Sequence, residues 1–173
     1  MRKNLALSGS KKGNVAIDLI VVVIILFGMA VSTIIGYALF EDIYPDLIDN
    51  TTGNTEAIKV TDDMHTNYPA YMDGAFLLAF VLLYMFVLVS AWALDTHPLF
   101  FIFTIMLLTF VLIFGAIISN SFEEIVGDGD FGMVSVNFPY SSFILNNLVE
   151  TLLVIGTSVA LVLYGKSASG GGL

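Results

Sequence analysis

The chain has 173 residues, of which 57% are hydrophobic and only 12% are charged, and its formal net charge is −9. Soluble domains carry about 25% charged residues, so this composition excludes an ordinary soluble domain and indicates a membrane protein. Six Lys and Arg residues are too few to form a nucleic-acid-binding surface, so nucleic acid is not an expected partner. The absence of cysteine excludes disulfides and cysteine-based metal or thiol chemistry.

The N-terminal segment, residues 1–14, is basic, and we expect it to form a short tail. An apolar run follows at residues 15–40. A helix rising ~1.5 Å per residue needs about 20 residues to cross a bilayer, so this run is long enough. The apolar core of a secretory signal has only about 7–15 residues. We therefore predict a retained first transmembrane helix.

A second interpretation of the same region rests on Lys12-Gly13 followed by Asp18, which resembles the processing site of type IV pilin-like precursors. The acidic residue of that site is usually Glu, and pilins have one apolar helix followed by a soluble head. This chain has three further apolar runs instead. We interpret Asp18 as a residue of the first helical turn, where the positive end of the helix dipole favours a carboxylate.

The longest apolar region spans residues 74–120 and consists of two blocks separated by Asp95, Thr96, His97 and Pro98. Each block lacks ionisable side chains and has the length of a membrane span. The pattern predicts transmembrane helices at 74–94 and 98–119, joined by a tight turn. A histidine beside an aspartate can act as a proton relay or a ligand, but we interpret Asp95 and His97 as polar residues of this turn, with Asp95 available to cap the next helix.

Two acidic segments, residues 41–73 and 120–139, separate the remaining apolar runs and are expected to be loops. A weak amphipathic pattern predicts a short surface helix within the first, and three glycines favour a loop in the second. The fourth helix is predicted at 140–164, with a flexible tail at 166–173. We expect residues 15–165 to form a single all-α membrane domain, a polytopic bundle of four transmembrane helices.

The charge distribution predicts the orientation of this bundle. Five of the six basic residues lie in the two terminal segments, and twelve of the fifteen acidic residues lie in the two long connecting segments. Four spans place both termini on one side of the membrane. The excess of Lys and Arg on the cytoplasmic side of membrane proteins then predicts cytoplasmic termini and external acidic segments.

Glu150 is the most costly residue of the predicted spans, because it lies about ten residues, or ~15 Å, inside the fourth helix. Asn146 and Asn147 precede it by about one turn, so both amides can approach its carboxyl group. Such an intramembrane polar cluster serves either as a proton or cation site or as a hydrogen-bonded contact between helices. We favour the contact, because no basic residue lies inside a predicted span and no proline interrupts one, whereas transporters normally have broken helices or several charged partners.

Four motifs carry a resemblance to a known group of proteins: KKGNVAID at the start, MDGAF, DTHPLFF and NFPYSSFI. With these motifs the chain resembles small four-helix membrane proteins of viruses that contain an internal membrane and of environmental microbes. The resemblance implies a structural or assembly role in a membrane. It implies no catalytic residues.

These observations predict a non-enzymatic integral membrane protein that is a structural or assembly component of a cell or virion membrane. We expect it to contact the lipid bilayer and to associate with itself or with another membrane protein, without a cofactor or a metal. Motifs of nucleophilic, metallohydrolase or phosphate-binding enzymes are absent from the sequence. One alternative is a small channel, transporter or holin-like protein that uses Glu150. Another is an accessory subunit of a membrane enzyme complex.

Overall fold

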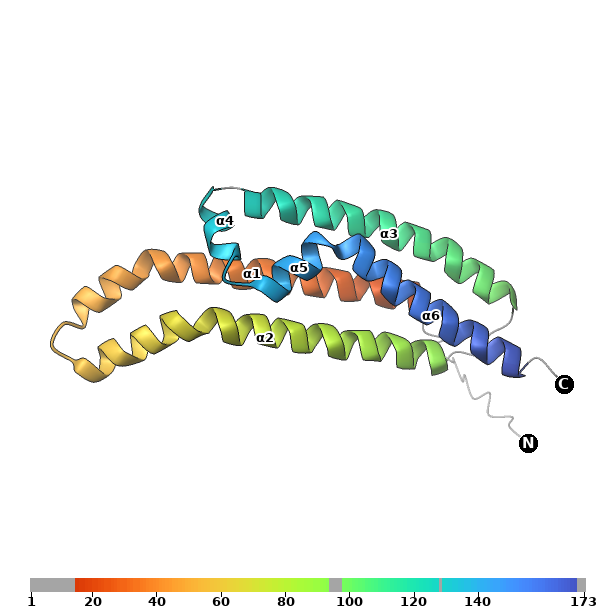
Figure 1. The fold of residues 1–173 in the computed structure, drawn as a ribbon, viewed down its shortest axis with the longest axis horizontal. Helices are drawn as coiled ribbons and strands as arrows, with labels where there is room; N and C mark the ends of the chain where they lie inside the picture. The colour runs from red at the N-terminus through yellow and green to blue at the C-terminus, as the bar shows by residue number, and fades with distance from the viewer. Residues whose placement is uncertain (1–14, 94–97, 128, 171–173) are drawn as a thin grey trace, which may run out of the picture.

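The structure is a computed structural model that describes residues 15–93, 98–127 and 129–170. These residues form six helices in chain order: α1 (Val15–Asn50), α2 (Thr55–Ala93), α3 (Pro98–Gly127), α4 (Gly129–Ser135), α5 (Pro139–Asn146) and α6 (Leu148–Gly170). Among the described residues there is no strand. The predicted all-α four-helix bundle is therefore confirmed, with α1, α2, α3 and α6 as its long helices (Figure 1).

The four long helices form a closed ring of neighbours, in which α1 packs on α2, α2 on α6, α6 on α3, and α3 on α1. Side chains at alternating spacings of three and four residues line the interior, because that spacing keeps them on one face of a helix. The buried apolar residues of α1 and α6 show this pattern most clearly: Leu19, Val23, Leu26, Ala30, Ile34, Leu148, Leu152, Ile155, Val159 and Leu163.

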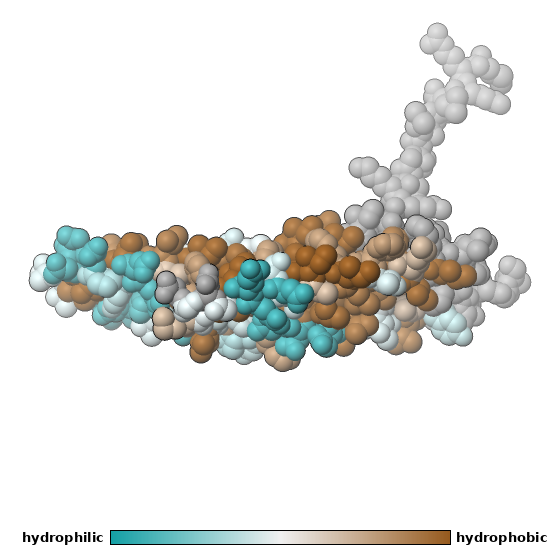
Figure 2. Space-filling view, turned by 90° about the horizontal axis from the view of Figure 1, so that it is seen from above, coloured by the Kyte–Doolittle hydropathy of each residue, from teal (hydrophilic) through white to brown (hydrophobic). Residues whose placement is uncertain are grey.

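Each of these four helices contains a segment long and apolar enough to cross a membrane. At most a third of the residues in any of these apolar segments are buried in the bundle, so most of their side chains face outward. Soluble proteins do not expose apolar surface on this scale. Figure 2 shows brown, hydrophobic surface over much of the half of the molecule away from the α1–α2 turn. The protein is thus embedded in a membrane.

The acidic segment 41–73 differs from its prediction, because it is helical except for the turn at residues 51–54. The Asn54 side chain accepts a hydrogen bond from the Ala57 N–H (3.1 Å) and so caps the start of α2. Gly53 has φ of 101°, a conformation that glycine adopts most readily. Pro45 and Pro69 lie inside α1 and α2, and both helices bend in the part leading to the turn (Figure 1).

The α1–α2 pair therefore extends past the rest of the bundle as a two-helix hairpin. We call residues 41–68 of this pair the projection. At ~1.5 Å per residue, the 36 residues of α1 measure about 54 Å, well beyond the ~30 Å thickness of a hydrocarbon core. Figure 1 shows the projection reaching beyond α3, α4, α5 and α6 at the end opposite the C-terminal end of α6.

The second acidic segment also differs from the expected loop. Helix α3 continues through it to Gly127, and α4 and a turn at residues 136–138 follow. The predicted fourth helix at 140–164 is two helices, because α5 ends at Asn146 and α6 begins at Leu148. The short helices fold back onto the long pair, with α4 against α1 and α5 against α2.

Candidate functional site

Glu150 occupies a different position from the one predicted for it. The helix break at Asn147 places it in the first turn of α6 instead of about ten residues inside a span. Its side chain is exposed on the outside of the bundle. At the N-terminus of a helix, the positive end of the dipole favours a carboxylate, so the position has a local stabilising cause. The expected burial of Glu150 among helices is not found within the chain.

Of the two amides predicted to approach Glu150, one makes another contact and the other is exposed. The Asn147 side chain donates to the Phe143 carbonyl (2.8 Å), and the Asn146 side chain is exposed. The backbone at the break is satisfied by α3, because the buried Ser119 hydroxyl lies within hydrogen-bonding distance of the Leu145 (2.9 Å) and Asn146 (3.1 Å) carbonyls. Asn146, Asn147 and Glu150 therefore share a short stretch of backbone but are not joined by hydrogen bonds.

The level of Glu150 in the bundle follows from two contacts between α2 and α6. The Tyr84 hydroxyl donates to the Ser158 hydroxyl (3.0 Å), and the Lys166 ammonium donates to the Trp92 carbonyl (2.8 Å). Both pairs are 74 residues apart, so the two helices run parallel and in register. This register places Glu150 at the same height along the bundle as Phe76, close to the start of the apolar run of α2. Glu150 thus lies near the end of a span.

Asp95 and His97, the polar residues of the predicted turn, lie outside the described residues. Among the residues that the structure describes, no group of three or more His, Asp or Glu side chains is placed to hold a metal ion.

Asp73 is a buried carboxylate whose role the sequence did not reveal. It is only 2% exposed and lies at the level where the α2 apolar run begins. Its carboxylate accepts hydrogen bonds from the backbone N–H groups of Tyr140 and Ser141 (both 2.8 Å) and from the Ser141 hydroxyl (2.6 Å). These N–H groups belong to the first turn of α5, where helix donors lack intrahelical partners.

Asp73 therefore caps α5 from another helix. The residue before α5, Phe138, provides no side-chain cap of its own. A capping carboxylate ordinarily belongs to the residue just before the helix, and here the same bonds come from 67 residues away. The only local signal was Pro139, which indicates a helix start. Nothing in the sequence indicates which acidic residue caps that helix.

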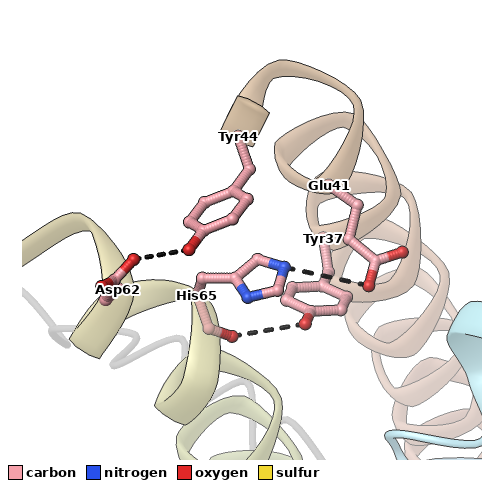
Figure 3. Close-up of polar contacts among 5 residues, drawn as sticks. All are labelled: Tyr37, Glu41, Tyr44, Asp62 and His65. Carbon is pink, nitrogen blue, oxygen red and sulfur yellow. Dashed lines mark hydrogen bonds and ion pairs between the residues drawn. The ribbon is translucent and has the colours of Figure 1, made fainter. Parts of the chain in front are cut away.

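The projection is held together by a cluster of rings and polar groups between α1 and α2 (Figure 3). The His65 ring stacks on Tyr44, with centroids 4.1 Å apart, and lies on the other side near Tyr37, at 5.7 Å. The Tyr44 hydroxyl donates to the Asp62 carboxylate (2.5 Å). His65 Nε2 lies 4.0 Å from a Glu41 carboxylate oxygen, within ion-pair distance when the imidazole is protonated. We call these five residues the His65 cluster.

Further contacts of Tyr37 stabilise the His65 cluster and, through Phe138, join it to the bundle. The Tyr37 hydroxyl donates to the His65 carbonyl (3.3 Å), and the Tyr37 ring stacks on Tyr68 and meets Phe138 edge-on, in each case with centroids less than 6 Å apart. Aromatic pairs at such distances stabilise by about 0.5–1.5 kcal/mol beyond their buried area. The cluster therefore fixes the spacing of the two helices just where the projection leaves the bundle.

A cleft of about 570 Å³ lies beside the His65 cluster and the α5 cap. Its lining combines rings, prolines and small polar groups: Tyr37, His65, Thr66, Pro69, Ala70, Asp73, Asn137, Pro139 and Tyr140. Its buried carboxylate, Asp73, already accepts three hydrogen bonds from the protein. The contacts at this level position helices, and we assign them a structural role.

The chain was compared with protein-family models, with curated proteins and with solved structures, and no match was found in any of the three comparisons.

Proposed function

We propose that this protein is a non-enzymatic structural or assembly component of a membrane, which anchors itself through the four-helix bundle and presents the projection to a partner outside the lipid. The projection carries the proposal. It consists of the ends of two long helices, α1 and α2, which continue well beyond their apolar spans. A scaffold that lay entirely within lipid would not need such an extension. The contacts of the His65 cluster support it, because they hold the extension in a defined shape.

The charge pattern supports an orientation for this proposal. The basic terminal segments favour the cytoplasm and the acidic projection the opposite side. The cysteine-free chain permits a direct test with single-cysteine variants. Thr52→Cys, in the turn of the projection, should react with a membrane-impermeant maleimide on intact cells, whereas Ser10→Cys should react only after permeabilisation. The reverse pattern would contradict the orientation.

Photo-crosslinking in the cells that make the protein tests the partner role. A benzophenone amino acid at Asp49, an exposed residue of the projection, should give a discrete protein adduct. The same group at Ile113, an outward-facing residue of the α3 span, is the matched control and should give lipid adducts. Failure to crosslink at Asp49 and at other exposed positions of both projection helices would contradict the proposal.

The alternative of an ion pathway through Glu150 gains little support from its position, because the residue lies near the end of a span and on the outside of the bundle. Purified protein in liposomes should show no ion flux. Flux that disappears in Glu150→Gln while insertion is intact would favour the channel. An adduct to a subunit of a respiratory or transport complex would favour the accessory-subunit alternative.

A further inference from the structure

The outer face of α2 carries a stripe that begins in the projection and continues toward the apolar run. Three exposed apolar or aromatic side chains and one amide recur along it at spacings of four, three and four residues, the period of a helix–helix seam: Val60, Met64, Asn67 and Tyr71. Val60 is 58% exposed, Met64 54% and Tyr71 73%. A groove of about 550 Å³ runs along this face, and all of its lining residues belong to α2.

Lipid does not account for the whole stripe. Met64 precedes Gly74, the start of the apolar run, by ten residues, and Val60 precedes it by fourteen. Along a helix these separations are about 15 and 21 Å. The headgroup layer on each side of a bilayer is only about 5–7 Å thick. Tyr71 therefore lies within reach of headgroups, whereas Val60 and Met64 extend beyond them.

A second copy of the chain is disfavoured by charge. Between residues 41 and 68 the projection carries seven acidic residues and one lysine: Glu41, Asp42, Asp46, Asp49, Glu56, Asp62, Asp63 and Lys59. Asp63 itself lines the groove. Packing two such faces together brings like charges into contact, which opposes association. The same charge favours a partner of opposite sign.

We propose that the Val60–Met64 face of α2 docks a basic amphipathic helix of a partner protein, which packs as a third helix along the projection. The partner's apolar side covers Val60 and Met64, as in other complexes in which a helix binds an apolar groove. Its Lys or Arg residues lie beside Asp63 and the neighbouring carboxylates. This inference rests on the proposed function, because it identifies the surface and the chemistry by which the projection is recognised.

The test uses the full chain in nanodiscs of zwitterionic lipid, with Asn67→Cys carrying an environment-sensitive fluorophore in the groove. The probes are two synthetic helices of roughly 18 residues, about five turns, with the same leucine seam and flanked by either lysine or glutamate. The lysine peptide should shift the emission saturably, and the glutamate peptide should not. Raising the salt from ~0.1 to ~1 M, which shortens the Debye length from ~10 to ~3 Å, should weaken binding.

Paired variants locate the surface. Val60→Ser with Met64→Ser should weaken binding of the lysine peptide by roughly tenfold or more, because two apolar contacts are lost. Ile43→Ser with Leu47→Ser is the matched control, since both residues are exposed on α1 of the same projection, and it should leave binding unchanged. Equal binding of both peptides, or no effect of the α2 pair, would overturn the docking surface.

Three further outcomes distinguish failure of the docking surface from failure of the proposed function. An emission change that depends on protein concentration without peptide would mean that a second copy covers the face, and the basic partner would be wrong. Crosslinks from Asp49 on α1 without lysine-peptide binding at α2 would overturn the docking surface and leave the proposed function standing. The absence of crosslinks from both projection helices would overturn the proposed function itself.

Discussion

The two halves of this protein share one pattern of apolar and acidic segments but have different structures. Each half has two apolar helices joined by an acidic segment, yet residues 41–73 form one long hairpin, whereas residues 120–139 fold into short pieces. Glycine content is one difference between the two connecting segments. Gly127, Gly129 and Gly132 fall within six residues of the second segment, and each costs a helix about 1 kcal/mol relative to alanine. The first segment has only Gly53, in its turn, before Gly74.

Acidic composition alone does not specify a loop. In the first half the acidic residues are compatible with helix because their side chains lie mostly on the exposed faces of α1 and α2. In the second half the helix is interrupted, and backbone groups at the helix ends lack partners within the helix. Asp73 and Ser119, which belong to other helices, form hydrogen bonds with these groups. The first half is stabilised by side-chain contacts between neighbouring helices. In the second half, residues far away in the sequence cap the ends of a short helix. The following substitutions test this division.

The largest effect is expected for Asp73→Ala. It removes three hydrogen bonds to a buried carboxylate and leaves the first turn of α5 uncapped, so we expect a loss of about 3 kcal/mol in the free energy of unfolding in detergent. Thermal unfolding followed by circular dichroism measures the loss. Asp63→Ala, at an exposed position of the same helix, should leave the Tm unchanged. Equal Tm values for the two variants would show that α5 does not depend on Asp73.

A smaller loss is expected for Gly156→Ala, at the close approach of α3 and α6. A Cβ atom built at this position lies 2.5 and 2.7 Å from the two Leu108 methyl carbons, so the Leu108 side chain must change its conformation or the two helices must separate, at a cost of about 1–2 kcal/mol. Gly28→Ala is the control, because a Cβ there meets nothing within 4 Å. It should stabilise α1 slightly through higher helix propensity. Destabilisation by both variants would contradict this local explanation.

Features set by neighbouring residues could be predicted from the sequence, whereas contacts between distant residues could not. Runs of about 20 apolar residues predicted four helices able to span a membrane, and these are confirmed, because length and hydropathy are local properties. The cap that Asp73 provides to α5 could not be predicted, since it joins residues 67 positions apart. Glu150 was predicted about ten residues inside a helix and lies in the first turn of α6, because the helix breaks at Asn147, where the sequence has no glycine or proline and α3 satisfies the backbone carbonyls.

In the first half, His65→Ala should loosen the projection and leave the bundle intact. The variant removes the ring stacked between Tyr37 and Tyr44, which is worth about 1 kcal/mol. Hydrogen exchange should become faster in residues 41–50 and 55–65 and remain unchanged in α6. Phe86→Ala, at an exposed ring in the α2 span, is the control. Faster exchange throughout the bundle would mean that the two halves do not respond independently.

The smallest effect is expected for Glu150→Gln. The side chain is exposed at the first turn of α6, so the loss of its charge forfeits only a weak interaction with the helix dipole. Membrane insertion and the Tm should both stay unchanged, as judged by carbonate extraction and thermal unfolding. A large change in oligomer size on loss of this charge would show that Glu150 is buried between subunits.

The common register of α2 and α6 has a consequence for how the protein is made. Parallel helices cannot be joined by a tight turn, so the contacts of Tyr84 with Ser158 and of Trp92 with Lys166 connect parts of the chain synthesised 74 residues apart. The α1–α2 hairpin leaves the ribosome before α6 exists. We therefore expect the hairpin to insert into the membrane first. The side of α2 that faces α6 then stays uncovered until α6 inserts and packs between α2 and α3.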